Sequence, residues 1–318
     1  MSSNHRTLVS RRSINRKKPV IISIATIPTR FKFVIEMISS LESQSIPVKH
    51  VIINVCSTYK RFKDSVQKTS IDSEVFSKVH TLNCKHNYEK YVIHQTEDKG
   101  TGTAIYGCYK YMQKSKERKI DEIFYVCTFH DDILPPSSFI NDLRQKLLET
   151  DERFVYCTEG YTHDMSGILS FPTESLKFTK VGLLSSRNGL VFTSLYLNQD
   201  IADFFDYFKL INMKYNDFPY VHVNNGLPYM FLLHCYLSCD SFISLYIEKR
   251  NGKIYKSPLH ILKGMKSIKY NDSDKGDVYK GAIKLNNPLF FNFLKANFSI
   301  FETFILKKQI CRQICRCI

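Results

Sequence analysis

Two adjacent aspartates follow the most apolar run of the chain. Asp131 and Asp132 come one residue after the run at residues 123–129 and shortly before Pro135 and Pro136. Ligands in open α/β sheets bind beyond the carboxyl ends of strands, where two neighbouring carboxylates would repel each other unless a cation lay between them. Mg²⁺ or Mn²⁺ binds through one or two such carboxylates together with phosphate oxygens. The pair therefore predicts a divalent-metal site for a phosphorylated ligand; the alternative is that the aspartates only cap the next helix or lie in a turn.

A second charged residue stands near the end of an earlier apolar run. Residues 19–25 are followed by a short turn that contains Thr26 and ends at Arg30. A guanidinium at a strand end can bind phosphate or carboxylate through two parallel hydrogen bonds. The alternative is a surface arginine in the first turn of a helix.

Alternating strands and helices would position these residues. The run at residues 19–25 is typical of a buried strand, the helix after it ends at Pro47, and residues 51–55 form a second strand. This order is a βαβ unit, which implies a parallel sheet with a right-handed crossover. Further strands are expected near residues 91–94 and at 123–129, with a helix between them. The first half of the chain is therefore α/β in character.

Several segments, taken in order, are similar to a known enzyme family. They are residues 22–31 (Ile-Ser-Ile-Ala-Thr-Ile-Pro-Thr-Arg-Phe), 38–44, 51–55, 59–62, 97–104 (Glu-Asp-Lys-Gly-Thr-Gly-Thr-Ala), 130–135 and 159–161. Their order and spacing over about residues 19–161 resemble the A-type, family-2-like glycosyltransferases found in bacteria and large DNA viruses. The resemblance implies metal-assisted transfer of a sugar from a nucleoside-diphosphate sugar to a glycan or protein acceptor.

The resemblance also implies a fold and an organisation of the chain. The expected fold is the A-type glycosyltransferase α/β fold, a mixed and mostly parallel sheet with helices on both faces and a C-terminal helical extension. Residues 1–18 would be a basic flexible arm, and residues 289–318 a C-terminal helix with a basic, cysteine-containing tail. Between them, residues 19–160 would form the nucleotide-sugar half of a transferase-like domain. Residues 161–288 would form an acceptor half, in which we expect aromatic-rich loops and helices.

The family pattern further implies which residues would hold the nucleotide. Thr26, Pro28 and Arg30 occupy the turn after the first strand, which holds the nucleotide in A-type glycosyltransferases. Asp98 would face the base or the ribose. Gly100 would allow the backbone to approach the ligand closely.

The metal would be Mn²⁺ or Mg²⁺ in this family. The resemblance implies that Asp132 is the principal ligand and that Asp131 is a ribose partner or a further support of the metal. His130 stands where the family has the first of three aspartates. Imidazole can bind Mn²⁺ and suits softer metals than Mg²⁺, so His130 is a third candidate ligand.

Two further departures concern activity. The family's loop lysine is replaced by Ala104, and its late acidic pair is replaced by Asn224-Asn225. In an inverting transferase that acid removes the proton of the acceptor hydroxyl, which asparagine cannot do. Either another group is the catalytic base, with Asp217, Asp164 and His222 the nearest candidates, or the chain is a degenerate member that acts as a binding or scaffold protein.

The net charge of +15 is concentrated at the two ends of the chain. Six basic residues within residues 1–18 and four within residues 307–318 account for ten of these charges, and neither segment contains an acid. Such tails attract anionic membranes or nucleic acid, or only aid solubility. A basic protein that binds nucleic acid through its tails is therefore a third option. The absence of a nucleic-acid-binding fold signature, even around the basic residues 249–269, argues against it.

Compartment and membrane contact are predicted from the chain ends and the cysteines. No apolar run of signal-peptide length precedes Pro19, and the ten cysteines include no CxxC pair, so we expect a cytoplasmic protein, in the host cell if the source is viral. Residues 289–306 show nearly helical spacing of apolar residues. This helix either docks on the core or lies on a membrane as a peripheral contact.

Overall fold

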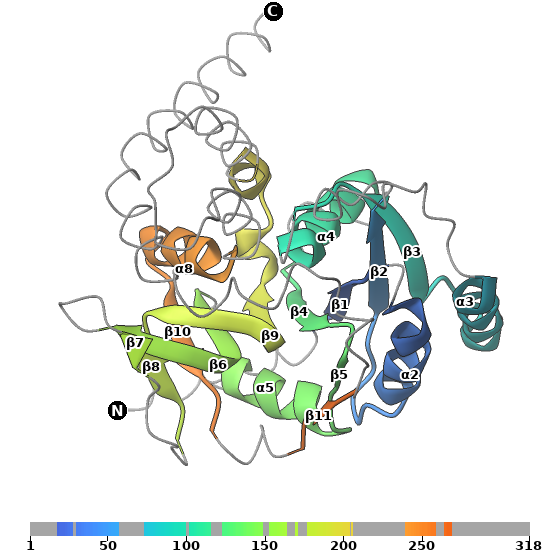
Figure 1. The fold of residues 1–318 in the computed structure, drawn as a ribbon, viewed down its shortest axis with the longest axis horizontal. Helices are drawn as coiled ribbons and strands as arrows, with labels where there is room; N and C mark the ends of the chain where they lie inside the picture. The colour runs from blue at the N-terminus through green and yellow to red at the C-terminus, as the bar shows by residue number, and fades with distance from the viewer. Residues whose placement is uncertain are drawn as a thin grey trace, which may run out of the picture.

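A nine-stranded sheet forms the centre of the protein (Figure 1). The computed structural model describes residues 18–27, 30–56, 73–99, 102–115, 123–148, 153–163, 169–170, 177–203, 205, 239–258 and 264–268. The strand order is β3-β2-β1-β4-β9-β6-β10-β8, with β7 paired to β6, and β5 pairs with β11 in a separate small sheet. The strands are β1 (Val20–Ala25), β2 (His50–Cys56), β3 (Tyr91–Thr96), β4 (Tyr125–His130), β5 (Ile133–Leu134), β6 (Phe154–His163), β7 (Leu169–Ser170), β8 (Thr179–Val181), β9 (Leu183–Thr193), β10 (Lys253–Lys256) and β11 (Lys266–Ser267).

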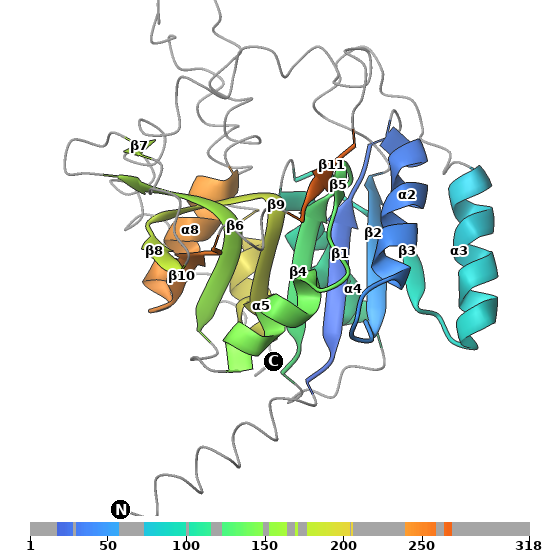
Figure 2. The same ribbon diagram turned by 90° about the horizontal axis from the view of Figure 1, so that it is seen from below.

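Helices cover both faces of this sheet (Figure 2). They are α2 (Phe31–Glu42), α3 (Ser73–His86), α4 (Thr103–Lys114), α5 (Phe139–Leu148) and α8 (Cys239–Lys249), with a 3₁₀ turn η3 at Ser194–Tyr196. Apolar residues of α2, α3 and α5 pack in one buried cluster on one face. Those of α4 and α8 belong to a second cluster on the opposite face. Burial of apolar surface on both faces is the main source of stability for such a layered fold.

The first half of the chain forms a parallel block. β1 lies between β2 and β4, and β2 also pairs with β3, all in parallel. Ala25 near the end of β1 lies beside Asn54 of β2 and His130 of β4, so these carboxyl ends are level with one another. The βαβ units predicted from the apolar runs are therefore present.

The sheet continues through the second half, where the sequence led us to expect mainly loops and helices. β9 runs antiparallel between β4 and β6, while β10 is parallel to β6 and antiparallel to β8. The strand β9 was not predicted because its middle, Ser185 to Gly189, lacks the alternation of apolar residues that is typical of a strand. Gly189 has φ of +128°, and an added Cβ would lie 3.0 Å from the Phe139 ring, so glycine is required there. The predicted fold class, a mixed and mostly parallel sheet with helices on both faces, is confirmed.

The predicted chain ends lie outside the described residues. These are residues 1–17 of the arm, and the C-terminal helix and tail at residues 289–318. Within the described ranges, every helix is too short or too polar to cross a bilayer.

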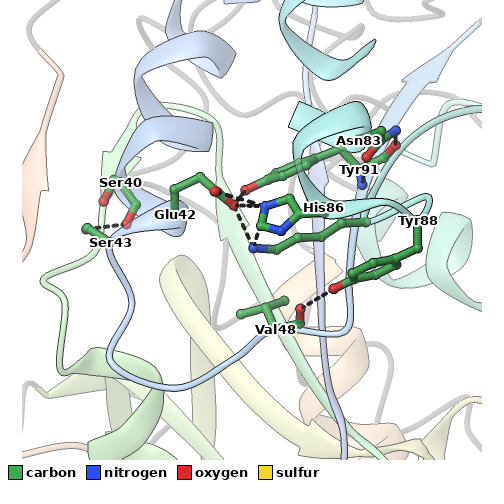
Figure 3. A network of polar contacts seen from close by, with 9 residues as sticks. Ser40, Glu42, Ser43, Val48, Asn83, His86, Tyr88 and Tyr91 are labelled. Atoms are coloured by element: carbon green, nitrogen blue, oxygen red, sulfur yellow. Dashed lines mark hydrogen bonds and ion pairs between the residues drawn. The ribbon is translucent and has the colours of Figure 1, made fainter. Parts of the chain in front are cut away.

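A polar cluster ties the amino-terminal edge of the sheet together, away from the carboxyl ends of the strands (Figure 3). Glu42 at the end of α2 accepts hydrogen bonds from Lys90 Nζ at 2.6 Å, from the Tyr91 hydroxyl at 2.5 Å and from His86 Nε2 at 2.9 Å. Burial raises the pKa of Glu42, but the combined effect of these hydrogen bonds is larger and opposite. The pKa is therefore lowered from its ordinary value of 4.5 to about 2. The ionised carboxylate therefore stabilises the folded state.

We expect Glu42→Gln to lower the free energy of unfolding at pH 7 by about 1–3 kcal/mol, because charged hydrogen bonds are lost. A depressed carboxyl pKa contributes stability that is fully present above the unfolded value near 4.5 and is lost as pH falls toward 2. The difference between wild type and variant should therefore shrink between pH 5 and pH 2 in urea unfolding. Glu36→Gln, on an exposed position of the same helix, is the control and should change stability little. A difference that stays constant with pH would contradict the role of the Glu42 charge.

Candidate functional site

The predicted site residues gather at the carboxyl-end edge of the sheet. Thr26 follows β1, Asp98 follows β3, and the pair Asp131 and Asp132 follows β4. Arg30 stands directly before α2. β2 and β1 separate β3 from β4, so with about 4.8 Å between neighbouring strands Asp98 lies roughly 14 Å along the edge from the aspartate pair. The parallel strands thus bring together residues that are distant in sequence.

Both carboxylate oxygens of Asp131 are bound by the turn after β1. The Thr26 hydroxyl donates to Oδ2 at 2.7 Å, and Arg30 Nη1 donates to Oδ1 at 3.0 Å. The Asp131 side chain is 3% exposed and the Arg30 side chain 12%. Burial raises the pKa of Asp131, the Arg30 charge and the Thr26 hydrogen bond lower it, and the neighbouring Asp132 charge raises it again. Asp131 therefore joins the ends of β1 and β4.

Asp132 is held differently. Its residue is 1% exposed, and its Oδ1 atom is buried without a hydrogen-bond partner among the described residues. Its main-chain oxygen accepts a hydrogen bond from the Ile268 amide at 2.8 Å. The pairing of β5 with β11 begins at the next residue, Ile133. The backbone of Asp132 is thus fixed, while one carboxylate oxygen has no hydrogen-bond partner within the described ranges. A buried carboxylate in this state is unfavourable unless a cation or donor reaches it.

A metal at this edge would have few protein ligands. Among the residues whose positions are described, no group of three or more His, Cys, Asp or Glu side chains could hold a metal ion. Both oxygens of Asp131 already accept hydrogen bonds, which suits its expected role as a supporting partner better than direct coordination. His130 ends β4 with a half-buried side chain. The orphaned Asp132 oxygen fits a hard cation such as Mg²⁺ or Mn²⁺, which takes one or two carboxylates and completes its shell with phosphate oxygens and water.

The loop between β3 and α4 carries a buried cation that was not predicted from the sequence. Asp98 is 1% exposed, and Lys99 beside it is 6% exposed. Lys99 Nζ lies 3.1 Å from Glu97 Oε2 and 4.6 Å from the centroid of the Tyr106 ring. In the glycosyltransferase pattern that the sequence resembles, the loop lysine corresponds to Ala104, so Lys99 was not predicted to have a role. Lys99, five residues before Ala104 in the same segment, was the feature of the sequence that could have predicted a cation in this loop.

A second overlooked residue is Asp203, which follows η3. Its residue is 0% exposed, and its Oδ1 accepts a hydrogen bond from Gln199 Nε2 at 3.3 Å. Gln199 in turn accepts a hydrogen bond from the Tyr109 hydroxyl of α4 at 2.6 Å. The carboxylate thus belongs to a buried polar contact between the second half of the chain and α4.

The remaining predicted residues lie outside the described part of the chain. They are Pro28 and Gly100 of the nucleotide group and the candidate bases Asp164, Asp217 and His222. Their roles stay predictions. The structure thus brings together Thr26, Arg30, Asp131 and Asp132 and leaves the acceptor side untested.

Comparison with solved structures gives distant likenesses to proteins that handle nucleotides. S. aureus TarS 1–349 in complex with UDP-GlcNAc is 15% identical with a TM-score of 0.34, over 56% of this chain and 46% of that chain. A nucleoside-diphosphate-sugar pyrophosphorylase from Vibrio cholerae RC9 is 14% identical with a TM-score of 0.39, over 81% of this chain and 98% of that one. The 2-C-methyl-D-erythritol 4-phosphate cytidylyltransferase of Francisella tularensis is 12% identical with a TM-score of 0.31, over 64% of this chain and 82% of that chain.

These likenesses concern the general course of the chain and do not extend to a reaction. The present chain spans about half the length of the TarS 1–349 chains, 46% in one complex and 55% in another. No protein-family model and no curated protein sequence matches the chain.

Proposed function

We propose that the protein is a glycosyltransferase that moves a sugar from a nucleoside-diphosphate sugar to a glycan or protein acceptor with the help of Mn²⁺ or Mg²⁺. The observation that carries this proposal is the buried Asp132 Oδ1 just beyond the carboxyl end of β4, which has no hydrogen-bond partner among the described residues. The cation that accompanies a bound diphosphate would supply positive charge beside this oxygen. The ordered sequence similarities across residues 19–161 support the same function.

The nucleotide would extend along the carboxyl edge of the sheet. Asp98 would accept hydrogen bonds from the base or the ribose at the β3 end, with Gly100 in the same loop. The diphosphate would lie near Asp132 at the β4 end, roughly three strand spacings away, or about 14 Å. This separation suits an extended nucleoside diphosphate.

Asp132 would hold the cation, whose charge would offset the negative charge that develops on the departing diphosphate. Asp131 would keep the strand ends in place through Thr26 and Arg30, and His130 would be a further ligand. Since Asp131 already offsets the Arg30 charge, the cation at Asp132 has a larger share in binding the diphosphate.

The catalytic base belongs to the acceptor half in this proposal. Asp217, Asp164 or His222 would remove the proton of the acceptor hydroxyl, a role that typically contributes 10²–10⁴-fold to the rate. The replacement of the family's acidic pair by Asn224-Asn225 favours one alternative, a degenerate member that binds a nucleotide sugar as a binding or scaffold protein.

A donor screen by thermal unfolding tests the proposal. We expect the melting temperature to rise when Mn²⁺ is added together with one of UDP, GDP or CDP, since a ligand of the native state adds about 2.7 kcal/mol at a hundred times its Kd. Mn²⁺ alone and nucleotide alone are the controls and should give smaller shifts. If no combination stabilises the protein, the proposed function is wrong. Donor hydrolysis or sugar transfer by a binding-competent protein then separates the enzyme from the binding protein.

A further inference from the structure

Beneath α4, four neighbouring strands carry buried polar side chains in otherwise apolar surroundings. Ser23 of β1, Asn54 of β2, His94 of β3 and Thr128 of β4 are between 0% and 8% exposed. Asn54 is level with His94, and Ser23 is level with Thr128. Each residue interrupts an apolar strand near its carboxyl end. Because buried polar groups are unfavourable without partners, their contacts indicate what they do.

Asn54 is the centre of this layer. Its amide nitrogen Nδ2 donates to Ser23 Oγ and to the Ile24 main-chain oxygen, both at 2.8 Å. The Ser23 hydroxyl donates in turn to the main-chain oxygen of Ala104 at 2.7 Å. The chain of contacts therefore runs from β2 through β1 to the first turn of α4.

The opposite atom of the same amide lies against the middle of α4. A Cβ added to Gly107 would lie 1.9 Å from Asn54 Oδ1, so the side chain occupies a notch that only glycine leaves open. Oδ1 is buried and has no hydrogen-bond partner in the described part of the chain. Asn54 thus contacts α4 in two ways. It is linked to Ala104 through the Ser23 hydroxyl, and its own side chain packs closely against Gly107.

The main chain of Asn54 extends the link toward the aspartates. Its carbonyl oxygen accepts a hydrogen bond from the Thr26 amide at 3.2 Å, and the Thr26 hydroxyl binds Asp131. On the other side, the first turn of α4 closes the loop that carries Asp98, because the Lys99 amide donates to Thr103 Oγ1 at 2.9 Å. Asn54 therefore contacts Ser23, which bonds to the first turn of α4 next to the Asp98 loop. It also contacts Thr26, which bonds to Asp131.

We propose that Asn54 is a positioning residue that holds the Asp98 loop in register with the Thr26–Asp131 contact. This inference rests on the proposed function where it concerns the nucleotide, and on the fold alone where it concerns α4. Asn54 does not touch the ligand. It acts through Ser23 and Ala104 on one path and through Thr26 on the other.

Three variants separate positioning from packing. Asn54→Ala removes the side-chain hydrogen bonds to Ser23 and Ile24, keeps the main-chain bond to Thr26 and leaves a cavity. Gly107→Ala forces a clash with Asn54. The double variant Asn54→Ala/Gly107→Ala places a methyl group in the notch, so it recovers packing without recovering hydrogen bonds. Ser23→Ala is a milder variant, which cuts the path to Ala104 and changes little volume.

The measurements are thermal stability, amide hydrogen exchange of α4, and the Kd for UDP, GDP or CDP with Mn²⁺. We expect the double variant to recover much of the melting temperature lost in each single variant. Exchange of the Cys108 amide, whose acceptor in α4 is the Ala104 carbonyl, should still be about fivefold to tenfold faster than in wild type, as expected on losing one or two buried hydrogen bonds. Ser23→Ala should show the same change with a smaller loss of stability.

Outcomes on the fold and on the nucleotide are distinguishable. If exchange of the Cys108 amide returns to the wild-type rate in the double variant, Asn54 only fills space and the proposal is overturned. If exchange stays fast and the nucleotide Kd rises about fivefold or more, the proposal stands in full. If exchange stays fast while the Kd remains that of wild type, the link to α4 exists but does not position the nucleotide, which refutes that part. Failure of the wild type to bind any nucleotide overturns the proposed function, and the exchange result still decides whether Asn54 positions α4.

Discussion

Asp132→Asn should abolish metal-dependent nucleotide binding and at the same time stabilise the protein without ligand. The first effect follows because the variant loses the carboxylate proposed to hold the cation. The second follows because Asp132 Oδ1, which has no hydrogen-bond partner in the part of the chain that the structure describes, is less unfavourable when it is neutral. The change also removes a charge that raises the pKa of Asp131. We expect a gain of about 1 kcal/mol in the free energy of unfolding, since an unsatisfied buried group costs about 1–3 kcal/mol and more when charged.

The two effects have opposite signs, which makes the experiment decisive. Urea unfolding without ligand gives the stability, and thermal unfolding with Mn²⁺ and the nucleotide found in the screen gives binding. Asp142→Asn on α5 is the matched control. Its carboxylate accepts a hydrogen bond from the Ser138 hydroxyl at 2.8 Å, so the variant should lose a little stability and bind as the wild type does. A less stable Asp132→Asn protein that still binds would show that Asp132 has a structural role alone.

The parallel half of the fold was predictable because its strands are short, continuous apolar runs. Residues 20–25, 50–56 and 125–130 are buried almost throughout, as parallel strands covered on both faces must be. β9 was not predictable in this way. Its polar middle and Gly189 depend on contacts with β6 and with the Phe129 and Phe139 rings, which no local pattern contains.

For the candidate site, the sequence predicted which strand ends the residues follow but could not assign their contacts. The rule that ligands lie beyond the carboxyl ends of strands placed Thr26, Arg30 and the two aspartates at one edge. Asp131 accepts hydrogen bonds from residues 101 and 105 positions away, whereas one oxygen of Asp132 has no partner among the described residues. No local sequence pattern contains this difference. The proposed positioning role of Asn54 could not be predicted from its residue type either, since it depends on the close packing of its side chain against Gly107. Tertiary contacts rather than residue types decide these roles.

The contact between Arg30 and Asp131 should be the most sensitive point of the fold at this edge. Arg30→Ala leaves a carboxylate that is 3% exposed with its charge uncompensated. Removing one partner of a buried ion pair typically costs about 3–5 kcal/mol, more than the pair itself contributes. Arg30→Ala should therefore lower the free energy of unfolding by this amount, measured in urea at pH 7.

Two comparisons test whether the uncompensated charge is the cause. Burial raises the pKa of Asp131, and without Arg30 it should rise further, so the carboxyl group takes up a proton in the folded state more readily than in the unfolded state. Stability then falls as pH rises through this range, and the deficit of Arg30→Ala should be larger at pH 7 than at pH 4. The double variant Arg30→Ala/Asp131→Asn should recover part of the loss at pH 7, because no charge remains buried. A deficit that is independent of pH and persists in the double variant would instead assign the loss to the packing of the arginine stem against its neighbours.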